Sequence, residues 1–281
     1  MYNDEYAATA AGAAAKVGLL KKNPLGYFLL SALAGAYIGF GILLSFTVSG
    51  TLGAIPMTKI AMGLSFGIAL SLVIIAGAEL FTGNAFVLYN GWRSKTVTLT
   101  DVIRLWVVCY LGNWFGAIVL SLLFYGAAGT AGGVGQALAN AAAMKMSLPP
   151  LVLFLRGILC NVLVCLAVWC GFRCKSDSGK LIMVFWCLYA FFTCGFEHSV
   201  ANMTVLTLGL LNPAGTAVSV GGYLYNLAFV TLGNIVGAVL FLSIPYGIAA
   251  KIDLWLVLLA LLIGELSAKL TERLLSFFIV E

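Results

Sequence analysis

His198 is the only histidine of the chain, and it lies between apolar stretches of membrane-spanning length. An ionisable side chain at such a depth is costly and by default indicates function. Because imidazole titrates close to the pH that cells experience, His198 could stabilise a passing anion or hand it a proton. The alternative is a neutral core histidine satisfied by a neighbour. Its position inside an interrupted apolar stretch favours the functional interpretation.

A second polar interruption carries Thr82, whose hydroxyl can donate to an anion or bind the imidazole without adding a charge. The pattern G-x-E-x-x-x-[GA]-N occurs at residues 77–84 (GAELFTGN) and again at 195–202 (GFEHSVAN). These two segments hold Thr82 and His198. We therefore expect the hydroxyl and the imidazole to pair.

Each segment also holds a carboxylate and an asparagine. A lone charged carboxylate inside a membrane is very costly, so we expect Glu79 and Glu197 to be ion-paired, hydrogen-bonded to the backbone or protonated, in a structural role. Asparagine side chains can satisfy backbone groups that an interrupted helix leaves free. We assign this supporting role to Asn84, Asn202, Asn113 and Asn234.

The composition indicates that lipid is the solvent for most of the chain. Of its 281 residues, 62% are hydrophobic and 9% are charged, against roughly a quarter charged in soluble domains. Six stretches are apolar and long enough to span a bilayer: 27–49, 58–90, 102–126, 149–172, 181–211 and 225–249. Because the polar segments interrupt the second and the fifth, the predicted fold class is an all-α membrane protein with two broken helices.

A second motif relates the two halves of the chain. The sequence LGNxxGA, followed by YG, occurs at residues 111–126 and again at 232–247 with identical spacing. Three spans per half reverse the membrane orientation of the second copy. The halves, about 27–126 and 149–249, are therefore predicted to be inverted three-helix repeats, with the permeation site where the broken helices meet.

Basic residues are distributed unevenly between the connections, and such residues are retained on the cytoplasmic side. Six spans with both termini cytoplasmic leave only Lys59 and Lys145 in the outer loops. We therefore expect a multi-pass protein of the inner (cytoplasmic) cell membrane. Residues 1–26 are predicted to form a cytoplasmic amphipathic helix, 27–250 a channel domain, and 251–281 a C-terminal amphipathic segment of unclear role.

The segments around Glu79 and Glu197 resemble the two signatures of the formate–nitrite transporter family. Supporting similarity lies at residues 23–26 (NPLG), 160–169 (CNVLVCLAVW) and 231–234 (TLGN), so the resemblance covers about residues 20–250. It implies an aquaporin-like protomer with its own pore, five protomers around a central axis, and small monovalent anions of weak acids as permeants. Within the family, the sequence is most similar to the nitrite channels. Nitrite is therefore the expected permeant, and hydrosulfide and formate are the alternatives.

The resemblance also implies roles for single residues. His198 is similar to the family's central pore histidine, Asn161 to a residue facing the site, and Lys145 to a vestibule lysine that attracts anions. Arg156 either snorkels toward the outer interface or lines the pore. Six residues match apolar constrictions, where narrowing can gate a pore by dewetting, although residue type alone favours core packing: Phe66, Leu70, Leu80, Phe81, Val164 and Phe191.

Other classes of protein fit the sequence less well. An aquaporin-type channel for neutral solutes should carry Asn-Pro-Ala at both breaks, yet that tripeptide occurs once, at residues 212–214, where it predicts a turn. A membrane redox enzyme would need paired thiols or axial histidines, and the seven cysteines have no CxxC spacing. We expect no catalysis, cofactor, metal or nucleic-acid partner; the expected partners are lipid, a small anion and four further copies of the chain.

Overall fold

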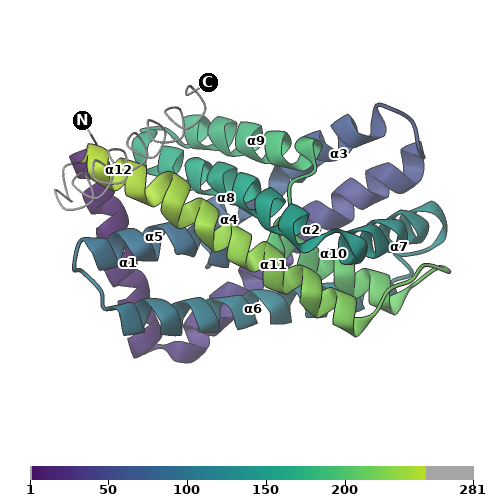
Figure 1. Cartoon of the computed structure of the whole chain (residues 1–281), viewed down its shortest axis with the longest axis horizontal. Helices are drawn as coiled ribbons and strands as arrows, with labels where there is room; N and C mark the ends of the chain where they lie inside the picture. Colours follow the sequence, from purple (N-terminus) through teal and green to yellow (C-terminus); the bar gives the residue numbers. More distant parts are fainter. Residues whose placement is uncertain (1, 251–281) are drawn as a thin grey trace, which may run out of the picture.

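The computed structural model of the chain describes residues 2–250, in which every regular element is helical (Figure 1). The predicted C-terminal segment 251–281 lies outside these described residues. The first half contains α1 (Asn3–Lys22), α2 (Pro24–Leu52), α3 (Thr58–Phe66), α4 (Ile68–Ala76), α5 (Phe81–Arg93) and α6 (Leu99–Gly126). The second half contains α7 (Gly132–Ser147), α8 (Pro150–Arg173), α9 (Asp177–Cys194), α10 (Ser199–Leu211), α11 (Val220–Ala238), the π-helix η1 (Val239–Ser243) and α12 (Ile244–Ala249).

Six helical stretches in the described part are long and apolar enough to cross a membrane, which confirms the predicted number. They are Pro24–Leu52, Thr58–Ala76, Leu99–Gly126, Pro150–Arg173, Asp177–Cys194 and Val220–Ala249. Their outer faces are apolar: on α6, Val107, Leu111 and Phe115 are 49–53% exposed and follow one another at helical spacing. Such a face is suited to contact with lipid rather than with water.

The second and fifth predicted spans are broken, and each break begins with a glycine. Gly77 (φ 77°) separates α4 from α5, and Gly195 (φ 76°) separates α9 from α10. Glycine adopts this left-handed backbone without the strain that a Cβ would cause, and so it ends a helix readily. The short helices α5 and α10 consequently begin inside the protein.

Three features of the helical path differ from the expectation. The sequence predicts a loop over residues 127–148, whereas the structure places α7 there. This helix is rich in alanine and glycine and has little apolar bulk, so it gives no spanning signal. Gly67 divides α3 from α4, and α11 passes into the π-helix η1 shortly before Pro245. Neither discontinuity interrupts the apolar stretch in which it lies.

Glycines lie in the two most extensive helix interfaces, α2 with α6 and α8 with α11. A Cβ on Gly116 would collide with the carbonyl of Ala32, and one on Gly237 with the carbonyl of Ile158. Close backbone approach of this kind supplies the van der Waals contact that holds membrane helices together. Both glycines belong to the LGNxxGA motif, which therefore marks the same kind of packing in each half.

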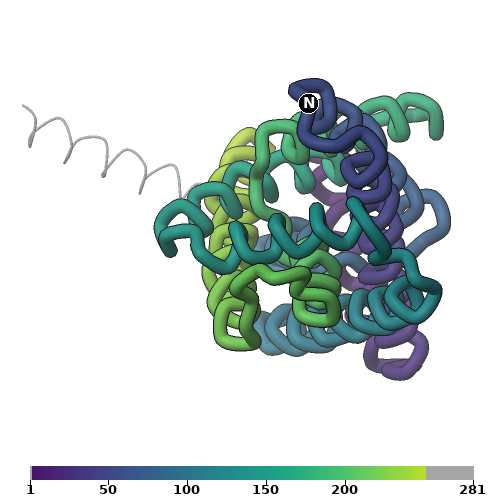
Figure 2. Tube along the Cα trace, turned by 90° about the vertical axis from the view of Figure 1, so that its right-hand side faces the viewer, coloured from purple at the N-terminus to yellow at the C-terminus, as the bar shows by residue number. Residues whose placement is uncertain are grey.

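The helices α1 and α7 lie toward opposite ends of the long axis of the bundle (Figure 1). Figure 2 is viewed from the end at which α7 lies and shows α7 lying across that end. α1 packs on α5, and α7 packs on α10. Each half of the chain thus begins with a helix that covers the short helix after its own break.

Candidate permeation site

The two breaks bring the side chains of Thr82 and His198 together inside the protein. Thr82 lies in the first turn of α5, His198 caps the N-terminus of α10, and both are buried. The Thr82 hydroxyl is 2.9 Å from His198 Nε2. Nδ1 accepts the N–H of Ala201 at 3.1 Å. Because Nδ1 is an acceptor, the proton of the neutral ring is on Nε2, which donates to Thr82.

An asparagine binds the backbone at both sides of each break. The N–H of Phe81, the first residue of α5, donates to Asn113 Oδ1, and the N–H of Ser199, the first residue of α10, donates to Asn234 Oδ1, both at 2.9 Å. The amide nitrogens of these asparagines donate to the carbonyl of the glutamate in the same break, at 2.8 and 3.0 Å. Asn113 and Asn234 thus satisfy backbone groups that the breaks leave free.

Each glutamate carboxylate is bound by a lysine from the helix that begins its half of the chain. Glu79 accepts from Lys16 of α1 at 2.7 and 2.8 Å, and Glu197 accepts from Lys145 of α7 at 2.9 Å through both oxygens. An asparagine on the short helix also donates to each carboxylate, at 2.9 and 2.6 Å: Asn84 and Asn202. Pairing and hydrogen bonding together offset the cost of burying the two charges.

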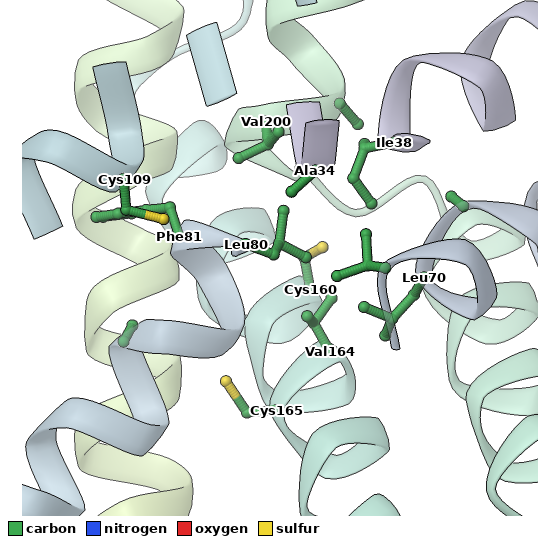
Figure 3. Packing of buried hydrophobic residues seen from close by; sticks show 14 of the residues in the cluster. Ala34, Ile38, Leu70, Leu80, Phe81, Cys109, Cys160, Val164, Cys165 and Val200 are labelled. Carbon is green, nitrogen blue, oxygen red and sulfur yellow. The ribbon is translucent and has the colours of Figure 1, made fainter. Parts of the chain in front are cut away.

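Apolar side chains close around His198. Ile38 of α2, Leu70 of α4 and Val164 of α8 converge with Leu80, which lies in the first break (Figure 3). The same space is lined by Phe66, Leu188 and Phe191. Its volume is ≈ 0 Å³, so the side chains leave no room for water. This is the arrangement of a dry constriction, which a solute crosses only when the side chains move apart.

A cavity lies on each side of this constriction. The first, here called the Lys16 cavity, has a volume of about 360 Å³ and reaches Leu70 and Leu80. The second, here called the Lys59 cavity, has a volume of about 690 Å³ and reaches His198. Because each cavity shares lining residues with the constriction, the three spaces form one path with a closed centre.

The comparison with known proteins agrees with this arrangement. The family model described as Formate/nitrite transporter matches residues 4–248. The chain belongs to this family. A nitrite transporter NirC of Salmonella typhimurium is 40% identical over 247 residues, which is 88% of this chain and 91% of the relative. The formate channel FocA of Escherichia coli (strain K12) is 30% identical over 263 residues, which is 85% and 92% of the two chains.

Solved structures of the formate/nitrite transporter family share the fold. A chain described as an FNT family ion channel superposes with a TM-score of 0.83 at 39% identity, over 88% of this chain and 98% of its own. A pentameric formate channel with formate bound gives a TM-score of 0.74 at 30% identity, over 82% and 98%. This chain is therefore a multi-pass, all-α membrane protein of that family.

Two residues assigned by resemblance have contacts that the resemblance does not imply. Lys145 lines the Lys59 cavity, as a vestibule lysine should, but its charge is paired: its ammonium is 2.9 Å from Glu197 and its side chain is only 15% exposed. It holds the second break in place. Phe81 does not line the constriction, because its ring packs on Tyr110 and Trp106, with centroids 4.9 and 6.3 Å away.

The other five residues with a predicted place in the constriction do line it: Phe66, Leu70, Leu80, Val164 and Phe191. Ile38 and Leu188 belong to the same wall and are not predicted, because nothing distinguishes them from the many apolar residues of their spans. Arg156 lines the Lys59 cavity, which favours the pore-lining reading over snorkelling.

Asn161 contacts the backbone of Thr82 in this transporter-family chain. Its Nδ2 donates to the main-chain carbonyls of Thr82 at 3.2 Å and Asn234 at 2.6 Å. The Cys165 thiol also donates to the Thr82 carbonyl, at 3.4 Å. Asn161 Oδ1 is buried and has no hydrogen-bond partner within residues 2–250. These contacts fix the backbone of Thr82 rather than reach His198.

Metal ligands do not gather in the described part of this family member. Within residues 2–250, no three His, Cys, Asp or Glu side chains lie close enough to hold a metal ion. All seven cysteines are free thiols, and four of them are buried.

Proposed function

We propose that this chain is a channel that conducts small monovalent anions of weak acids across the cell membrane, with nitrite as its permeant, and that it has no catalytic activity. The observation that carries the proposal is the dry constriction beside Thr82 and His198, with a cavity at each end. Relatives that are named nitrite transporters, 38–40% identical, favour nitrite over formate, for which a probable transporter is 35% identical and the named channels are 30% identical.

We further propose two inverted repeats of about 27–126 and 149–249 within a channel domain at 27–250, and five such protomers in one assembly. The matched hydrogen bonds of Asn113 and Asn234, and the matched ion pairs of Glu79 and Glu197, support the repeat. The pentameric formate channel among the similar structures supports the assembly. The distribution of basic residues supports cytoplasmic termini, which places the Lys16 cavity on the inner side.

An anion that crosses the constriction must leave its water behind, which is costly in apolar surroundings. His198 is the polar side chain in the wall of the constriction, and its Nε2 can turn its hydrogen from the Thr82 hydroxyl toward the anion. The short helices α5 and α10 begin at the two breaks and direct the positive ends of their dipoles to this region. Donors without a fixed charge favour an anion but let it leave again.

The tautomer of His198 decides how the ring takes part. A protonated ring needs a hydrogen on Nδ1, but Nδ1 faces the N–H of Ala201. We therefore infer that the ring acts on the anion as a neutral donor through Nε2. Proton transfer to the anion would first require the ring to leave its place at the N-terminus of α10.

Anion flux into proteoliposomes tests this function. Nitrite, formate, hydrosulfide and divalent sulfate are compared between about pH 5 and pH 8, for the wild type and for His198→Ala. We expect nitrite to be fastest, sulfate to be excluded, and the variant to lose flux by a similar factor at every pH. A variant that instead loses only the pH dependence would indicate proton transfer by His198. No flux above protein-free liposomes would refute the channel.

A further inference from the structure

The two cavities differ in unpaired positive charge. In the Lys16 cavity both lysines have an acidic partner: Lys16 pairs with Glu79 at 2.7 Å and Lys180 pairs with Asp177 at 3.1 Å. In the Lys59 cavity, Lys145 is neutralised by Glu197. This leaves two further cations in the wall of the Lys59 cavity that have no acidic partner among residues 2–250: Lys59 and Arg156.

Both of these cations lie beside the break that carries His198. The Lys59 ammonium is 3.6 Å from the position that a Cβ on Gly195 would occupy, and Gly195 is the first residue of the break. The main-chain carbonyl of Arg156 accepts the N–H of Glu197 at 3.2 Å. Lys59 belongs to α3 and Arg156 to α8, and both residues line the cavity that also reaches Gly195 and Glu197.

Charge in a cavity with walls of low dielectric constant acts strongly on a passing ion. Field lines are focused in such a space, which raises the local concentration of counter-ions. The Lys16 cavity offers paired lysines only, and the field of an ion pair falls off more steeply than that of a single charge. An anion therefore meets unequal attraction at the two ends of the same path.

We propose that Lys59 and Arg156 capture the anion, so that the pore fills at a lower anion concentration from the side of the Lys59 cavity than from the side of the Lys16 cavity. This inference rests on the proposed function. It does not let the channel accumulate its permeant, because a passive pore cannot change the equilibrium across the membrane. The asymmetry lies in the half-saturating concentration and in the initial rate at low anion concentration.

Nitrite uptake into right-side-out and inverted membrane vesicles that contain the full chain tests the proposal. The half-saturating concentration is measured at about 10 mM and about 500 mM ionic strength, where the screening length changes from roughly 30 Å to a few ångström. For the wild type at low ionic strength we expect the two faces to differ by about tenfold. At high ionic strength the difference should vanish.

The double variant Lys59→Gln/Arg156→Gln should abolish the difference at low ionic strength by raising the half-saturating concentration at one face only. The charge-preserving variant Lys59→Arg/Arg156→Lys should keep it, as should the control Lys180→Gln at the other end of the path. An unchanged melting temperature establishes that the double variant is folded.

Two results would overturn the proposal: equal half-saturating concentrations at both faces of the wild type at low ionic strength, or a difference that survives in the folded double variant. Failure of the underlying function is distinct from these results, because the wild type would then carry no nitrite from either face.

Discussion

The hydroxyl of Thr82 is the one hydrogen-bond partner that the described structure gives to His198 Nε2, at 2.9 Å. Thr82→Val keeps the shape of the side chain and removes that hydroxyl, so the imidazole loses the partner that orients it. We expect anion flux to fall by about tenfold, equivalent to about 1.4 kcal/mol in the barrier. Flux into proteoliposomes measures the change.

Thr204→Val is the matched control for this substitution. Thr204 is also buried, in α10, but its hydroxyl has no hydrogen-bond partner among residues 2–250. Anion flux through the Thr204→Val variant should stay near that of the wild type. Equal losses in both variants would mean that removing any buried hydroxyl disturbs the channel, and the special role of Thr82 would be lost.

The ion pair between Lys145 and Glu197 gives a prediction about stability. Glu197→Gln leaves the lysine, only 15% exposed, without its charge partner. Breaking a buried pair in this way costs about 3 kcal/mol of the free energy of unfolding. Lys145→Met in addition removes the unpaired charge and should restore most of the loss. Unfolding by titration with denaturing detergent measures all three proteins.

The contrast for this pair is Glu5→Gln, which breaks the more exposed pair of Glu5 with Arg173 at 3.3 Å. Exposed ion pairs of that kind contribute at most about 1 kcal/mol to the free energy of unfolding. If the double variant at 145 and 197 were as unstable as Glu197→Gln alone, the lysine would not be the reason for the loss.

At the scale of residues, the sequence predicts that a buried polar side chain needs a hydrogen bond or an opposite charge. It predicts less well which residue supplies it. The repeated motif is sufficient to predict that Thr82 pairs with His198 and that Glu79 and Glu197 need compensation. It does not predict Lys16 as the partner of Glu79, because 63 residues separate them and only the packing of α1 on α5 brings them together. The same limit explains why Lys145 is not predicted as the partner of Glu197.

The elements are held together at glycines that admit a neighbouring backbone. Gly116→Ala would push a methyl group into the carbonyl of Ala32 on α2. We expect the free energy of unfolding to fall by about 1–3 kcal/mol, the usual cost of overpacking. The same denaturing-detergent titration measures it.

Gly126→Ala, at the end of the same helix α6, is the control. A Cβ at Gly126 meets no heavy atom within 4 Å in the described chain. There the greater helix propensity of alanine should leave stability unchanged or raise it slightly. Destabilisation of both variants by the same amount would show that backbone approach at Gly116 is not what matters.

At the scale of elements, apolar length predicts the six spans to within a few residues, and the polar motifs predict both breaks. The helix α7 is not predicted, because its small residues give no membrane-spanning signal. The pairing of its Lys145 with Glu197 depends on tertiary contact, which the sequence pattern does not show. The discontinuities at Gly67 and η1 lie within stretches that are apolar on both sides, so a hydropathy pattern does not mark them.

The molecule as a whole has the form of a path with a closed centre, and its two breaks place the polar groups at that centre. Composition and the repeated motifs predict this arrangement because a helix ends inside the membrane in both halves. The backbone groups freed at that end need polar partners in each half. The difference between the two cavities is not predictable from the motifs. That difference depends on which lysines are paired with a carboxylate in the folded protein.

The central claim is that nitrite crosses the membrane through the dry constriction, and opposite changes to its width test this most directly. The measurement is nitrite flux into proteoliposomes for the wild type, for Leu80→Ala, which widens the constriction, and for Val164→Phe, which narrows it further. We predict flux in the wild type, faster flux in the first variant and nearly none in the second, provided that each retains its fold. No flux in the wild type, or flux that is the same in all three proteins, would contradict the account.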